Sequence, residues 1–127
     1  MNNKDKLCLK WNEFETNIRD SFRELREEKN HFDVTLASDD GHQIEAHRMI
    51  LSSGSQFLKN VLKKIKHPCP FIYLKGVRGI ELEYVVNFLY NAETFVALED
   101  LGQFLEIAQD LEINGIFFIV FHLIRPR

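Results

Sequence analysis

The stretch "FDVTLASDDGHQIEAHRMI", residues 32–50, contains two short apolar runs, a turn between them and the start of a helix. Residues 32–38 and 42–47 are predicted to form the two strands of a hairpin. Gly41 ends the "DDG" turn, where a glycine takes the positive φ of a tight hairpin at no steric cost. A short helix is predicted from His47 to Ser53, so strands and helices alternate closely in this chain.

Two charged residues flank the predicted hairpin. Asp33 stands at the head of the first apolar run, and Arg48 follows the second run beside His47. Two interpretations remain open for these residues. The first is a structural Asp–Arg ion pair within one chain, in which bidentate hydrogen bonds satisfy both charges. The second is a charged floor beneath a groove or an interface.

The rest of the chain mixes the two periodicities. "KLCLKW" at residues 6–11 alternates like a half-buried strand, and the next segment carries apolar residues at helical spacing from Phe14 to Leu25. Asn12 and Glu15 have the spacing of a capping box, which predicts that this helix starts at Asn12. Further elements are predicted as a helix from Ser55 to about Lys66, a strand at 71–76 covered on both faces, a helix within 79–91, a strand at 94–98 and a helix from about Glu99 to Leu111. The pattern predicts an α+β fold.

Length and composition predict one globular domain. The chain has 127 residues, of which 45% are hydrophobic and 28% charged, and its formal net charge is -3. Its one dense basic stretch, "KKIK" at 63–66, is too short to track a phosphate backbone, so no direct nucleic-acid binding is expected. Cys8 and Cys69 lie far apart, and nothing resembles a secretory leader, which predicts a reduced, intracellular protein.

The last residues form an unusual apolar segment. We expect the domain to span residues 1–116, followed by a tail at 117–127. Nearly every residue from Ile116 to Ile124 is apolar, and Arg125, Pro126 and Arg127 follow. A membrane-spanning helix needs about 20 apolar residues, so no membrane association is expected. The segment is interpreted either as a last element packed on the core or as a surface for another chain.

No residue pattern indicates catalysis, a metal or a cofactor. His42 and His47 are five residues apart across a strand, which places them on opposite faces, and no second ligand pair has zinc spacing. His67 and Cys69 lack the orienting third group of a nucleophilic dyad. Neither glycine-rich phosphate-binding motif occurs. The sequence therefore predicts a protein that is not an enzyme.

Five segments together resemble the BTB/POZ domain in order and spacing. They are "LCLKWNEFETNIRDSFRELREE", "FDVTLASDDGHQIEAHRMILSSGS", "HPCPFIYLKGV", "VVNFLYNAETFVA" and "LGQFLEIAQDLEINGI". The motif Leu9-Lys10-Trp11-Asn12, near the start of the chain, resembles more narrowly that of the arthropod tramtrack and bric-a-brac group. This resemblance covers residues 7 to about 116. It implies the BTB/POZ fold, a small mixed sheet with a cluster of helices, assembled as a strand-exchanged dimer.

The resemblance also implies a function and a set of residues for it. Such domains are protein-interaction modules, usually homodimers, of nuclear transcription and chromatin factors, and this group is associated with assemblies larger than dimers. The implied dimer interface combines the arm, the first helix and the strand at 94–98. Its residues are Leu7, Leu9, Trp11, Phe14, Ile18, Phe22, Thr94, Phe95 and Val96. Asp33, His47 and Arg48 match a charged pocket that the family links to dimer assembly.

The resemblance is compatible with several functions. Partners are expected to be a second copy and other BTB-containing transcription factors or corepressors. One alternative is a substrate adaptor of a cullin-type ubiquitin ligase, in which the helix after Ser55 offers a glutamate; "FLKNVLKKIK" has lysines instead. Another alternative is a BTB-only protein that pairs with zinc-finger BTB proteins.

Overall fold

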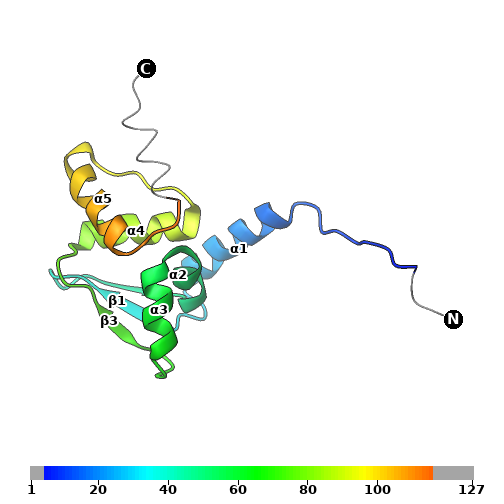
Figure 1. The fold of residues 1–127 in the computed structure, drawn as a ribbon, viewed down its shortest axis with the longest axis horizontal. Helices are drawn as coiled ribbons and strands as arrows, with labels where there is room; N and C mark the ends of the chain where they lie inside the picture. The colour runs from blue at the N-terminus through cyan, green and yellow to red at the C-terminus, as the bar shows by residue number, and fades with distance from the viewer. Residues whose placement is uncertain (1–4, 116–127) are drawn as a thin grey trace, which may run out of the picture.

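The structure, a computed structural model, describes residues 5–115, and the predicted tail at 117–127 lies outside the described residues. Helices pack on one side of a small sheet, and an extended arm precedes the first helix (Figure 1). In chain order the elements are α1 (Phe14–Glu27), β1 (Val34–Ala37), β2 (Gln43–Ala46), α2 (Arg48–Gly54), α3 (Gln56–Lys64), β3 (Phe71–Tyr73), α4 (Gly79–Asn91), a 3-10 turn η1 (Leu98–Asp100) and α5 (Leu101–Asp110). The α+β prediction is confirmed.

The sheet has three strands in the order β2-β1-β3. β1 pairs with β2 antiparallel, with Leu36 opposite Ile44, and pairs with β3 in parallel. The predicted hairpin is confirmed, although its strands are shorter than the apolar runs. Gly41 has a φ of 83°, as its position in the turn requires.

One hydrophobic core lies between the sheet and the helices α2 to α5. α4 contributes most to it, because apolar residues cover nearly its whole circumference. The buried core residues with 3% exposure or less are Val34, Leu36, Ala46, Ile50, Leu51, Leu58, Leu62, Leu82, Val85, Val86, Tyr90, Phe104 and Ala108. None of the residues of α1 is fully buried. The core is therefore built without the arm and without most of α1.

The hairpin turn holds the start of α4. Both carboxylate oxygens of Asp40 accept hydrogen bonds from the Gly79 amide, at 2.9 and 3.1 Å. Hydrogen bonds from the Ser38 hydroxyl and from this amide keep the pKa of Asp40 below its usual value. A Cβ on residue 79 would lie 2.7 Å from the Cβ of His42, so the close approach of turn and helix requires a glycine.

A buried carboxylate completes the same helix start. Glu81 is fully buried, and its two oxygens accept hydrogen bonds from the backbone amide and the guanidinium of Arg78, at 2.9 and 3.0 Å. Asp100 accepts a second bond from that guanidinium and one from the Tyr84 hydroxyl, which lowers the pKa of Asp100. The bonds from Arg78 stabilise the buried carboxylate of Glu81, and those to Asp100 connect η1 to α4.

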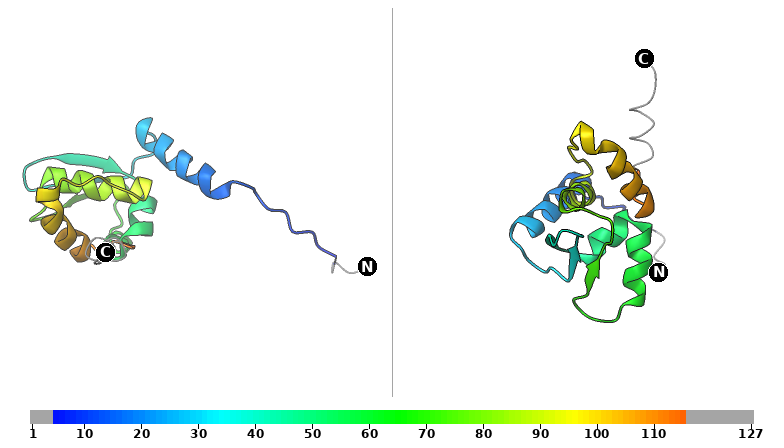
Figure 2. Two further views of the ribbon diagram at one scale, coloured as in Figure 1. Left: turned by 90° about the horizontal axis from the view of Figure 1, so that it is seen from above. Right: turned by 90° about the vertical axis from the view of Figure 1, so that its left-hand side faces the viewer.

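Two predicted strands are not strands in the structure. Residues 6–11 and 94–98 form no paired strand. Both segments have the alternating pattern. A strand, however, is defined by hydrogen bonds to a neighbouring strand, and in the single chain neither segment has such a neighbour. The arm extends away from the rest of the molecule in Figure 1 and in the left view of Figure 2.

Two smaller predictions are also wrong. The first helix starts at Phe14, after Glu13 in the left-handed region with a φ of 64°, and no side chain caps it. Asn12 is therefore one residue too far from the helix to form a capping box with Glu15. β3 is not covered on both faces, because Phe71 and Tyr73 point away from the core and are more than half exposed.

Core packing can be tested with two neighbouring residues of α3. Leu58 is fully buried and Lys59 is exposed. We expect Leu58→Ala to lower the free energy of unfolding by about 2–5 kcal/mol, because it removes apolar contacts and leaves a cavity. Lys59→Ala should change it by less than about 0.5 kcal/mol. Chemical denaturation at equal protein concentration measures both, and equal effects would contradict this description of the core.

Candidate functional site

The three residues predicted as a charged pocket do come together, where β2 ends and α2 begins. We call Asp33, His47 and Arg48 the junction. Asp33 Oδ1 accepts a hydrogen bond of 2.7 Å from the backbone amide of Arg48. This amide is one of the first in α2 and has no partner within its own helix. The Asp33 carboxylate therefore caps α2 from the neighbouring strand, where it also meets the positive end of the helix dipole.

The Arg48 side chain points elsewhere. Its guanidinium donates to the carbonyl oxygens of His67, Leu62 and Ile65, at 3.2, 3.1 and 3.4 Å. Leu62 and Ile65 lie at the end of α3, where carbonyls lack helical partners and the dipole attracts a cation. The expected direct ion pair between the Asp33 and Arg48 side chains is thus not formed. Each charge instead satisfies the unpaired backbone groups of a helix end.

His47 is buried between two other parts of the chain. Its Nε2 lies 2.6 Å from the carbonyl oxygen of Asn30, which can only accept, so Nε2 carries the proton. Its Nδ1 lies 2.5 Å from the Tyr90 hydroxyl, which also accepts from the His47 backbone amide at 2.9 Å. The hydroxyl therefore donates to Nδ1. This arrangement satisfies every hydrogen-bonding group involved.

Tyr90 connects the junction to α1. Burial raises the pKa of Tyr90 to about 12, so its hydroxyl keeps the proton that it donates to His47. The guanidinium carbon of Arg26 lies 5.0 Å from the centre of the Tyr90 ring, a cation–π distance. Arg26 also donates to Asn87 Oδ1 at 2.8 Å. The end of α1 is thereby held against α4, although the start of α1 is free of the core.

The residues of the junction make hydrogen bonds that connect parts of the fold. The hydrogen bonds of Asp33, His47 and Arg48 described above all run to other parts of the same chain. Within residues 5–115 no group of three or more His, Cys, Asp and Glu side chains is placed to hold a metal ion. No helix in that range has the length and apolar character to cross a membrane. These contacts give Asp33, His47 and Arg48 a structural role within one chain, although not as the direct ion pair of the first interpretation.

The predicted interface residues divide into two groups. Leu7 and Leu9 are 90% and 91% exposed, Phe95 is 87% exposed, and Trp11 and Phe14 are at least half exposed. The structure brings Trp11 and Phe14 into an edge-to-face contact with ring centres 5.0 Å apart. The other members, Ile18, Phe22, Thr94 and Val96, are partly buried. Phe22 and Val96 pack against the core of their own chain.

Sequence reasoning missed one exposed residue and one buried residue. Leu98 is as exposed as Phe95, at 87%, but it begins the 3-10 turn and so falls outside a strict two-residue alternation. The sequence analysis did not identify Tyr90 as the buried partner of His47. Its position before the end of an apolar helix was the available signal, because a buried tyrosine hydroxyl needs a hydrogen-bond partner.

A family model described as the BTB/POZ domain matches residues 22–124. The chain belongs to the BTB/POZ family. Among Drosophila melanogaster relatives of this BTB/POZ chain, "Longitudinals lacking protein-like" is 40% identical over 91% of each chain. "Protein abrupt" is 41% identical over 86% of this chain but only 12% of its own length. "Protein tramtrack, alpha isoform" is 32% identical over 87% of this chain and 14% of its own length.

The fold agrees with that of a solved BTB domain. The BTB domain of zebrafish PATZ1 matches with a TM-score of 0.81 and covers 94% of this chain and 98% of its own. Only 15% of the aligned residues are identical, so this likeness concerns the fold alone. The resemblance seen in the sequence is confirmed at the level of family and fold.

The His47–Tyr90 contact predicts an effect of Tyr90→Phe. This change leaves the His47 amide and Nδ1 buried without partners, so we expect the free energy of unfolding to fall by about 1–3 kcal/mol. Tyr73→Phe is the matched control, because the Tyr73 hydroxyl bonds the exposed Asp39; its effect should stay within about 0.5 kcal/mol. Denaturation curves measure both, and equal losses would contradict the buried network.

The raised pKa of Tyr90 predicts a dependence on pH. The folded chain holds this proton up to about pH 12, whereas the unfolded chain releases it near pH 10. The resulting stabilisation is complete below about pH 10 and is lost as pH rises towards 12. Stability should therefore fall more steeply over this range in the wild type than in Tyr90→Phe. Parallel slopes would show that the Tyr90 pKa is not raised.

The two interpretations of the junction can be separated by Asp33→Ala. Loss of the α2 cap should lower the free energy of unfolding by about 1 kcal/mol. Asp20→Ala, at an exposed position of α1, is the control and should have little effect. Under the structural interpretation, the variant stays in the same assembly as the wild type while it is folded. A fully folded variant with a changed mass in light scattering would favour the interface interpretation instead.

Proposed function

We propose that this BTB/POZ domain is a protein-interaction module that forms a homodimer by exchanging its arm, residues 6–11. The arm of one copy pairs with residues 94–98 of the other, and α1 packs across the dimer axis. The observation that carries this proposal is the exposure of large apolar side chains on both segments. Leu7, Leu9, Phe95 and Leu98 are each at least 87% exposed in a single chain.

Exposure of this kind is costly in water. Burying apolar surface stabilises by about 25 cal/mol for each Å², and each of these side chains contributes nearly its whole area. A cluster of exposed large apolar side chains marks an interaction surface. The arm cannot reach residues 94–98 of its own chain without bending back along α1, since it points away from the molecule (Figure 2). Exchange between two copies therefore gives both segments a partner.

Two further features support pairing along residues 94–98. Thr94 and Val96 are partly buried while Phe95 is exposed, which is the alternation of a strand with one covered face. The Thr94 hydroxyl is buried and has no hydrogen-bond partner within the described part of the chain. An unsatisfied buried hydroxyl costs about 1–3 kcal/mol. An arriving strand brings backbone donors and acceptors with which residues 94–98 can pair.

A shallow groove supports the packing of α1 across the axis. It has a volume of about 280 Å³ and lies between α1 and the end of α4. Phe14, Ile18 and Phe22 line one side, and Leu89 lies on the other. Its surface is mainly apolar, so it suits the aromatic side chains of a second α1.

The biological setting of the proposed dimer is transcription control in the nucleus. Its support is the family membership and the relatives, in which the matched region is a small part of a much longer protein for abrupt and tramtrack. In this role the dimer recruits or pairs with other BTB-containing transcription and chromatin factors. Dimers also associate into larger assemblies, as the resemblance to the tramtrack and bric-a-brac group implies. Contact with nucleic acid falls to other parts of such proteins.

One observation favours a second candidate. The match to "Longitudinals lacking protein-like" covers 91% of that relative, so a protein made largely of this domain exists among the relatives. A BTB-only protein of this kind pairs with longer family members through the same arm and α1. A cullin-ligase adaptor is less well supported, because the helix after Ser55, "FLKNVLKKIK", has lysines and no glutamate.

Light scattering tests the homodimer. At micromolar concentration the wild type should have twice the mass of one chain, and a monomer would overturn the proposal. Phe95→Asp should weaken pairing by roughly 30-fold or more, the effect of about 2 kcal/mol at an interface centre. The fold should persist, because the Phe95 side chain makes little contact within its own chain. Phe71→Asp, on exposed β3, is the control and should remain dimeric.

Co-purification distinguishes the two candidates. The tagged full chain is recovered from nuclear extract, and mass spectrometry identifies what accompanies it. Untagged copies of the chain support the homodimer, whereas zinc-finger BTB proteins without such copies support the BTB-only partner. In both cases Phe95→Asp should remove the recovered protein and Phe71→Asp should not. Cullin recovered equally with both variants would contradict both candidates.

A further inference from the structure

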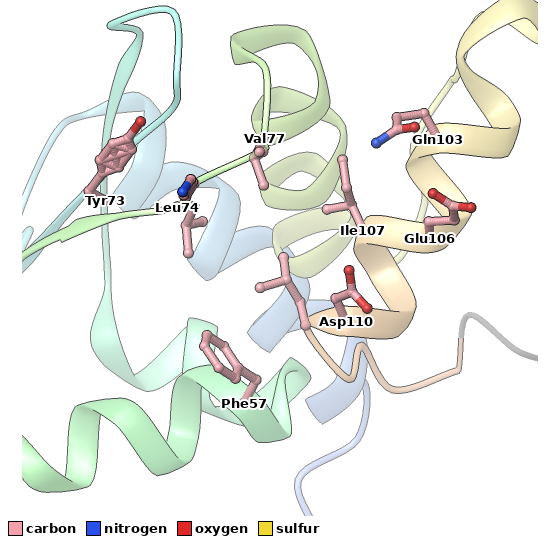
Figure 3. Close-up of a pocket in the computed structure, with 11 residues that line it drawn as sticks. Phe57, Tyr73, Leu74, Val77, Gln103, Glu106, Ile107 and Asp110 are labelled. Carbon is pink, nitrogen blue, oxygen red and sulfur yellow. The ribbon is translucent and has the colours of Figure 1, made fainter.

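A pocket of about 350 Å³ lies between the start of α3, the segment after β3 and α5 (Figure 3). Leu74, Val77, Ile107 and Leu111 form its floor and are all nearly buried. Phe57 stands at its edge with 38% of its surface exposed. The volume is at the lower end of the range of about 300–1,000 Å³ that is usual for binding pockets.

The rim of this pocket is acidic on one side. Glu106 and Asp110, both on α5 (Figure 3), are among the lining residues of the pocket, and both are exposed. Lys75 is the basic residue of the lining. The pocket therefore suits an apolar segment that also carries positive charge. None of the residues predicted for the dimer interface lines it, so dimer formation leaves it open.

The described chain ends beside this pocket. After α5, Asn114 donates from its backbone amide to the Gly54 carbonyl at 2.8 Å, and Glu112 accepts from the Gln56 amide at 3.2 Å. These bonds fix residues 112–114 against the α2–α3 connection, next to Phe57 of the pocket. Gly115 follows with a φ of 82°, a backbone conformation in which the chain changes direction.

The segment that continues from this point has the matching chemistry. Residues 116–124 read "IFFIVFHLI", and Arg125 and Arg127 follow. We propose that this segment folds back onto its own chain and places some of its apolar side chains in the pocket, with Arg125 and Arg127 facing Glu106 and Asp110.

Geometry and tethering support this occupant. Residues 116–127 reach up to about 40 Å when extended, and they follow directly on residues 112–114, which are bonded next to Phe57 of the pocket. A short tether raises the effective concentration of the segment to the millimolar range, so even modest contacts suffice. The tail thereby removes two apolar surfaces from water at once: its own and that of the pocket.

Hydrogen exchange of the full chain, followed by mass spectrometry, tests the proposal. Phe57→Asp places a charge at the pocket edge, and the amides of residues 116–124 should then exchange roughly tenfold faster than in the wild type. Phe71→Asp, outside the pocket, is the matched control and should leave the exchange of this segment unchanged. Equal exchange in the wild type and in Phe57→Asp would overturn the proposal.

Charge reversal provides a second test that does not alter the core. Glu106→Lys with Asp110→Lys should speed exchange of residues 116–124 roughly fivefold, as should Arg125→Glu with Arg127→Glu. The four changes together should restore slow exchange, because the opposite charges face each other again. Glu45→Lys with Glu99→Lys makes the same net change at exposed positions away from the pocket and should have no effect.

Two outcomes separate this proposal from its competitors. If exchange of residues 116–124 became faster on dilution of the protein, the tail would be bound to another chain. If the charge reversals and the Glu45/Glu99 control had equal effects, the change in exchange would be due to net charge alone. Either outcome would overturn docking in cis. Phe95→Asp should leave the exchange of residues 116–124 slow, so failure of the dimer and failure of tail docking are distinguishable.

Discussion

The imidazole of His47 is the constraint on which the arrangement of the other elements depends. It stands where the sheet passes into the helices, and its two nitrogens bind segments 17 residues before it and 43 residues after it. The Tyr90 hydroxyl donates and accepts in the same small space, and Arg26 lies against the ring of Tyr90. The sheet, α4 and the end of α1 are positioned together because these groups satisfy one another only in this geometry.

Local patterns explain why much of this fold could be predicted from the sequence. The hairpin at residues 32–47 has a two-residue period around a glycine turn, and the helices have their own period, so each is visible within a short window. The partners of Arg48 were not predictable in this way. They are backbone carbonyls at the end of α3, and carbonyls leave no mark in a sequence. The same applies to Asp33, whose acceptor role depends on where α2 begins.

The two missing strands show a different limit. Residues 6–11 and 94–98 both have the alternation of a strand. Burial follows that alternation at residues 94–96, where Phe95 is exposed while Thr94 and Val96 are partly buried, but every residue of 6–11 is exposed in the single chain. A ladder of hydrogen bonds, however, belongs to a pair of segments. A pattern in one segment can indicate that a partner is needed, but it contains no information on which chain supplies it.

The hydrophobic core is complete within one chain, and the arm contributes nothing to it. Substitutions at Leu7 or Leu9 consequently escape the selection that maintains folding, whereas those at Leu36 or Leu51 do not. After gene duplication, the arms of two copies are free to diverge in sequence while the scaffold beneath them stays constant. If the proposed arm exchange holds two copies together, a single fold can in this way give rise to many chains that no longer pair with one another.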